Sequence, residues 1–273
     1  EEIVSTIVGR VEADTLSNIK TKRPDNMASY DLVLQGLEYA KKGNVMKENT
    51  QKAVELFEKA IDLEPSYARA HAWRACTLSN LADWEENPDP KIFENAFESI
   101  KLALELDSNE PEVHRIMGAL KLWHERDHET ARYHFEKARE LCPSDVFIIS
   151  RYAIMLIYFG EFDKALKELK RAKRLDPFSH DLIFGPEATC HYWLDNPKEA
   201  LQTFKKVKVK KNYLFYIALT HKKSGDNDQA SDNLREAHAL TGMDNDSFIG
   251  TQPFIDQDIL STLKNELSEI QTN

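Results

Sequence analysis

The sequence is poor in cysteine and has no long apolar run. Its three cysteines, Cys76, Cys142 and Cys190, are spaced as neither a zinc site nor a disulfide framework would require. We therefore expect a reducing, cytoplasmic setting. The longest apolar run, around 153–159, is far too short to span a bilayer, so we expect no membrane segment. No secretory signal peptide is visible.

Basic residues are also outnumbered. Lysine and arginine total 36 against 46 aspartates and glutamates, a net charge of −10, which argues against nucleic acid as the main ligand. There is no Gly-rich phosphate loop, no Gly-x-Ser-x-Gly and no Cys/His pair suited to nucleophilic chemistry. We expect neither a cofactor nor catalytic residues in this segment.

What the sequence does contain is a repeated marker pattern. In 165–177 it reads Ala165, Leu169, Ala172 and Pro177, and copies begin at Ala53, Ala96, Ala131, Ala200 and Ala230. The first three markers share one helical face, and the proline ends the helix. Pro143 and Pro177 are 34 residues apart, the period of a stacked two-helix repeat.

A second helix is expected before each marker helix, with a small residue near its middle. These small residues are Gly36, Ala75, Gly118, Ala153, Ala188 and Ala218. They allow the two helices of a unit to approach closely. The pattern predicts an all-α solenoid of about six helix-turn-helix repeats.

These motifs resemble the tetratricopeptide repeat (TPR) family over 28–242. Met117-Gly118 and Tyr152-Ala153 fit the family's large-small pair on the first helix. The resemblance implies a right-handed array that binds protein or peptide segments on a concave surface lined by the first helices. Three departures are expected: about five extra residues in the turn near 43–50, about nine at 83–91, and a late start or kink at Gly185-Pro186.

The two ends resemble the TPR region of bacterial multidomain regulators, such as class III adenylate/guanylate cyclases and winged-helix activators. On this interpretation, 1–26 is a helix and linker from a preceding domain, 27–245 is the array and 246–273 is a C-terminal capping segment. The chain starts at Glu1 in mid-helix, so we expect a piece of a longer protein with an effector domain upstream.

The groove prediction follows from the repeat phase. If the first helices of repeats three to five start at Pro111, Val146 and Asp181, their thirteenth residues are Trp123, Tyr158 and Trp193. This aromatic row would hold a peptide, or would only pack between repeats. The other predicted groove residues are Arg115, Phe147, Ile154, Ile157, Thr189 and Tyr192.

Two alternatives remain open. His124, Glu125 and His128 form HExxH, and His134 follows, so a zinc hydrolase is conceivable. However, Ala131 replaces the glycine that the third-ligand turn needs, and the repeat phase places a turn between His124 and His128. A homo-oligomerisation module is the second alternative. The lysine/asparagine clamp for a chaperone's C-terminal carboxylate is missing, and the lysines of 205–211 indicate a solvated turn.

Overall fold

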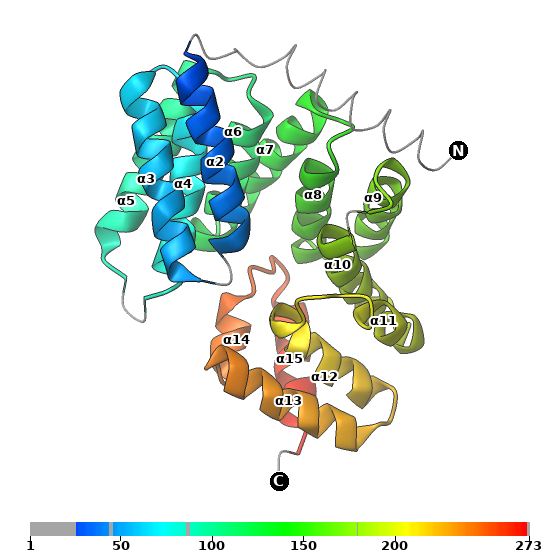
Figure 1. Cartoon of the computed structure of the whole chain (residues 1–273). Helices are drawn as coiled ribbons and strands as arrows, with labels where there is room; N and C mark the ends of the chain where they lie inside the picture. Colours follow the sequence, from blue (N-terminus) through cyan, green and yellow to red (C-terminus); the bar gives the residue numbers. More distant parts are fainter. Residues whose placement is uncertain (1–25, 44–45, 86–87, 179, 272–273) are drawn as a thin grey trace. The chain divides into compact units, whose positions relative to one another are not determined.

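The computed structural model describes residues 26–43, 46–85, 88–178 and 180–271. Within these ranges the chain is all α-helical, as predicted, and contains no strand. The helix predicted for 1–20 lies outside the described residues. The chain divides after Pro143 into two compact units (Figure 1), which we describe separately as the N-terminal unit (26–143) and the C-terminal unit (144–271).

Each unit contains three of the predicted helix pairs. The N-terminal pairs are α2 (Met27–Gly43) with α3 (Lys47–Leu63), α4 (Ala68–Ala82) with α5 (Pro90–Leu106), and α6 (Pro111–Leu120) with α7 (His128–Leu141). The C-terminal pairs are α8 (Val146–Tyr158) with α9 (Phe162–Leu175), α10 (His180–Trp193) with α11 (Pro197–Phe204), and α12 (Leu214–Lys223) with α13 (Asn227–Thr241). Two further helices follow, α14 (Asn245–Thr251) and α15 (Gln257–Ser268).

The marker residues form the contact surface within each pair. All six first alanines are completely buried, as are all the second alanines that occur. The predicted small residues stand opposite them: a Cβ on Gly118 would lie 2.9 Å from the ring of Phe135. The alanines and glycines therefore let the backbones approach while one large side chain fills the space between them.

The two long insertions are accommodated differently. The extra residues near 43–50 lengthen α2 and α3 to 17 residues each, so the prediction of a longer turn there is wrong. Thr50, for example, is a buried residue of α3. The second insertion does form a longer connection, because α4 ends at Ala82 and α5 begins at Pro90.

The Gly185-Pro186 pair lies inside α10, which starts at His180 and continues to Trp193. The expected late start is therefore wrong. Gly185 has a packing reason: a Cβ there would lie 2.1 Å from the ring of Tyr213. The Thr189 hydroxyl donates to the Gly185 carbonyl one turn earlier at 3.1 Å.

Repeat three contains one residue more than the marker phase allows. Gly118 precedes Ala131 by thirteen positions, whereas Ala153 precedes Ala165 by twelve. A π-helical turn, η1 (Lys121–Glu125), absorbs the extra residue. It ends at Arg126 in the left-handed region (φ 56°). Such turns insert one residue into a helix without ending its packing.

Candidate peptide-binding groove

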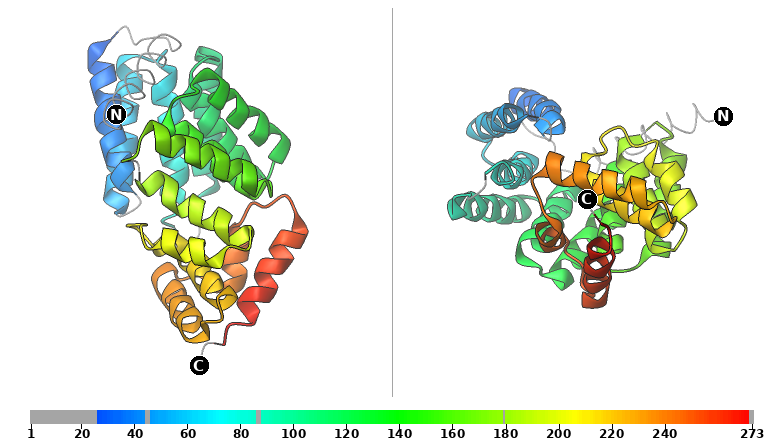
Figure 2. Two further views of the ribbon diagram at one scale, coloured as in Figure 1. Left: turned by 90° about the vertical axis from the view of Figure 1, so that its right-hand side faces the viewer. Right: turned by 90° about the horizontal axis from the view of Figure 1, so that it is seen from below.

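One position recurs in each pair of the C-terminal unit, seven residues before the first alanine of the marker helix. Tyr158 holds it in α8, Trp193 in α10 and Lys223 in α12. We call these three residues the groove row. All three touch the segment 252–270, which contains α15. In Figure 2 this segment, drawn in red, lies beside α10 and α12, in agreement with the contacts below.

Phe254 is the aromatic anchor of this segment and is only 2% exposed. Its ring packs edge-on against Tyr158, with centroids 5.0 Å apart, and against Trp193 at 5.6 Å. The next residue adds a backbone contact, because the N–H of Ile255 donates to the Tyr158 carbonyl at 3.1 Å. Two aromatic rings and the Tyr158 carbonyl at the end of α8 thus hold an extended stretch of chain.

The acidic end of α15 meets the lysines of α12. Glu266 accepts a hydrogen bond from the Tyr192 hydroxyl and pairs with Lys223 at 3.4 Å. Lys222 donates to the Glu269 carbonyl at 3.2 Å and approaches its carboxylate at 3.7 Å. Lys223 also lies 4.4 Å from the centre of the Tyr192 ring, a cation–π contact. Charge complementarity thus extends the contact beyond the aromatic anchor.

The two tyrosines behind the groove row, Tyr192 and Tyr216, are buried. Burial, and the hydrogen bond to Glu266, raise the pKa of Tyr192. Burial also raises the pKa of Tyr216, whose ring packs edge-on against Tyr192 at 5.5 Å. Both phenols therefore stay neutral at physiological pH, and Tyr192 acts as a hydrogen-bond donor.

The remaining predicted groove residues of this unit fall into two groups. Ile157, Thr189 and Tyr192 are buried, so only the polar end of Tyr192 serves the segment. Phe147 and Ile154 are partly exposed, and the Arg151 guanidinium lies 4.9 Å from the centre of the Phe147 ring.

In the N-terminal unit, the π-turn shifts the predicted row by one residue. Seven positions before Ala131 stands His124, not Trp123. The packing agrees: His124 lies on Phe93 with centroids 4.6 Å apart, just as Trp193 lies on Phe162 at 5.3 Å. The predicted equivalence of Trp123 with the later aromatics is therefore wrong. Counting back from the marker alanines would have identified both His124 and Lys223.

Arg115, the other predicted residue of this unit, is 3% exposed. Its guanidinium pairs with Glu112 at 2.7 Å and lies 5.0 Å from the centre of the Trp73 ring. Arg115 is thus held among side chains of its own and the preceding repeat.

The three histidines of the alternative zinc site, His124, His128 and His134, are not brought together. His124 Nε2 lies 2.6 Å from the Ser79 hydroxyl, and His134 Nδ1 lies 2.9 Å from His114 Nδ1. His128 begins α7, after the left-handed Arg126 has broken the helix. Over the described residues, no three His, Cys, Asp or Glu side chains are grouped as metal ligands would be.

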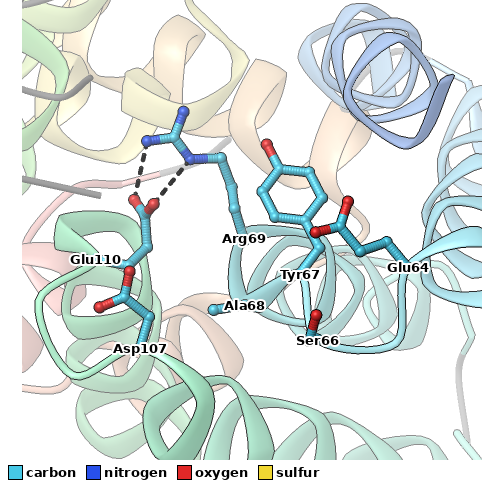
Figure 3. Close-up of a pocket in the computed structure, with 7 residues that line it drawn as sticks. All are labelled: Glu64, Ser66, Tyr67, Ala68, Arg69, Asp107 and Glu110. Atoms are coloured by element: carbon cyan, nitrogen blue, oxygen red, sulfur yellow. Dashed lines mark hydrogen bonds and ion pairs between the residues drawn. The ribbon is translucent and has the colours of Figure 1, made fainter. Parts of the chain in front are cut away.

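A small pocket lies where the turns of repeats one and two meet their following helices (Figure 3). Its space of about 10 Å³ suits one water molecule. Arg69 and the buried Glu110 form its wall through two hydrogen bonds of 3.1 and 3.0 Å. The remaining lining residues are Glu64, Ser66, Tyr67, Ala68 and Asp107. A space of this size does not admit a larger ligand.

The lysines of 205–211 are exposed around the turn after α11, as expected for a solvated turn. The Nζ of Lys206 lies 5.4 Å from the centre of the Phe184 ring. Among the described helices, none combines the length and apolarity needed to cross a membrane.

No protein-family model matches the sequence, and no curated protein matches it at the threshold of significance. Solved structures do match. PilF of Pseudomonas aeruginosa is 20% identical with a TM-score of 0.54, over 80% of this chain and 94% of that one. The TPR protein TTC0263 of Thermus thermophilus is 17% identical with a TM-score of 0.53, over 79% of this chain and 100% of that one. Human IFIT1, solved as a dimer with m7Gppp-AAAA, is 19% identical with a TM-score of 0.60, over 74% of this chain and 48% of that one. These likenesses establish a TPR-type α-solenoid fold.

Proposed function

We propose that this chain is a non-catalytic scaffold that binds a protein or peptide segment on the first-helix face of α8, α10 and α12. One observation supports this most directly: the face already holds a peptide, the chain's own segment 252–270. Phe254 is its anchor, and Tyr158 supplies both a ring and a backbone acceptor. Aromatic contacts plus a backbone hydrogen bond are a common mode of peptide recognition.

The resemblance of the two ends supports a finer proposal. The array would be the regulatory or assembly segment of a bacterial cytoplasmic signalling protein, such as an adenylate cyclase. The partner would then be a protein segment, including one from its own parent chain. The net charge of −10 favours a protein over a nucleic acid, although IFIT1, which shares the fold, was solved with m7Gppp-AAAA.

Binding of a peptide in trans tests the proposal. The probe is a fluorescein-labelled synthetic peptide of residues 251–271, and the protein is the full chain with its own anchor removed by Phe254→Ala. We expect saturable binding by fluorescence anisotropy. Adding Trp193→Ala should weaken it about tenfold or more, since aromatic anchors dominate such contacts. Tyr133→Ala, which truncates an exposed ring of the N-terminal unit, should leave it unchanged. A folded variant that does not bind the peptide would overturn the proposal.

A further inference from the structure

The segment 252–270 is attached to the repeats but is not part of any repeat helix pair. Helix α14, just before it, is fixed by Phe248, which stacks on Phe215 of α12 at 4.1 Å. After α14 the chain becomes extended at Gln252. The segment can therefore leave the groove by rotation near Gln252, without opening a repeat.

Few apolar side chains hold the segment in place. Of residues 252–270, those buried are Pro253, Phe254, Leu263, Leu267 and Ile270. Its ion pairs face solvent in part, since Glu266 and Glu269 have side chains 25% and 65% exposed. Such pairs contribute little and are screened by salt. The ionic part of the contact is therefore specific in pattern yet modest in strength.

We propose that this segment is a built-in competitor for the groove, and that the partner that displaces it is an acidic segment with the same pattern. This rests on the proposed function. The pattern is an aromatic residue followed by an amphipathic helix. In the competitor, Leu263, Glu266 and Leu267 follow Phe254 by nine, twelve and thirteen positions.

Each element of that pattern matches a groove feature. The aromatic residue packs against both Tyr158 and Trp193. The backbone N–H of the residue that follows it donates to the Tyr158 carbonyl. The glutamate accepts from the Tyr192 hydroxyl and pairs with Lys223. A basic partner helix would place like charges against Lys222 and Lys223, so the groove selects against it.

Competition predicts a difference between the wild-type chain and a chain with a weakened competitor. The labelled 251–271 peptide should bind the Phe254→Ala chain about tenfold or more tightly than the wild type, because the tethered segment acts at a high effective concentration. Gln257→Ala, which truncates an exposed side chain of the same segment, serves as the matched control and should behave as the wild type. If Phe254→Ala does not fold, Glu266→Lys provides the weakened competitor instead.

Hydrogen exchange reports displacement directly. With saturating peptide on the wild-type chain, amides of α15 should lose protection while those of α8 and α9 keep it. Equal peptide affinity for the wild-type and weakened chains, with α15 still protected, would overturn the competitor proposal and leave peptide binding standing. Absence of binding to a folded, weakened chain would instead overturn the proposed function. Mass doubling on sedimentation, with α15 protected, would show exchange of the segment between two copies and also overturn cis competition.

Discussion

Gly36 of α2 stands directly over the ring of Phe57 of α3, so that a Cβ at Gly36 would lie 2.6 Å from Cε1 of the ring. Phe57 is completely buried and has no room to retreat. We therefore expect Gly36→Ala to destabilise the N-terminal unit by about 1–3 kcal/mol, despite the better helix propensity of alanine. Urea denaturation followed by circular dichroism measures this.

The matched control for that substitution is Gly250→Ala in α14. A Cβ at Gly250 would meet no atom within 4 Å. Here only helix propensity acts, so the variant should be as stable as the wild type or slightly more so. Equal effects of the two substitutions would show that close approach is not the reason for glycine at position 36.

A second prediction concerns acid. His114 and His134 share a hydrogen bond, while His114 Nε2 faces the Ser108 carbonyl at 2.9 Å. Burial, and the neighbouring His114, lower the pKa of His134 to about 4; burial also lowers the pKa of His114. Because the unfolded chain takes up these protons first, stability should fall as the pH drops from about 6.5 towards 4, by on the order of 2–3 kcal/mol.

Replacing the ring tests this assignment. His134→Gln should flatten the decline in the urea midpoint between pH 7 and pH 4.5, whereas His128→Gln, outside the pair, should leave the decline in place. An unchanged pH profile in His134→Gln would mean that other groups cause the acid sensitivity.

A third prediction concerns the Arg69–Glu110 pair. The Glu110 side chain is only 3% exposed, and it also caps α6 by accepting from the Glu112 N–H at 3.2 Å. Arg69→Met would leave a buried carboxylate without its cation and should cost about 3 kcal/mol. Adding Glu110→Gln removes the charge but keeps the cap, so the double variant should regain most of that loss. A double variant no better than Arg69→Met would contradict this view.

A fourth prediction concerns Asp195, which has φ 56° after α10 where Gly160 and Gly225 have φ 73° and 80° after α8 and α12. Glycine adopts this region without strain, so Asp195→Gly should stabilise the C-terminal unit by about 0.5–1 kcal/mol. Asp195→Ala removes the same 4.0 Å contact with Lys223, but alanine does not relieve the strain of a positive φ. This variant should therefore not stabilise the C-terminal unit. Thermal denaturation of both variants checks this.

The helix pairs could be predicted from the sequence because the same physical requirement recurs six times. Ala53, Ala131 and Ala165 are all completely buried, since each must let a neighbouring helix approach. Repetition averages out local exceptions such as Gly185-Pro186. A single long-range contact has no such redundancy. For this reason the contact between Phe254 and Tyr158 could not be predicted from the sequence.

Three of the predicted groove residues do contact the segment 252–270 in the structure, although their role in binding a partner stays a prediction. Tyr158, Trp193 and Tyr192 were selected by repeat phase, and they contact Phe254 or Glu266. Lys223 was missed because the prediction selected aromatic residues and did not consider every residue seven positions before a marker alanine. His124 was missed because counting forward from Pro111 cannot reveal an added residue before Ala131.

The π-turn at 121–125 therefore has a consequence for engineering. It accommodates, as a local bulge, the one residue by which the spacing in this repeat exceeds that of repeats four to six. Deleting His124 should convert the turn to regular α-helix and place Trp123 on Phe93, where His124 now lies. Trp123 would then stand seven residues before Ala131, the position that Tyr158 and Trp193 hold in their repeats. The HExxH sequence would no longer be present.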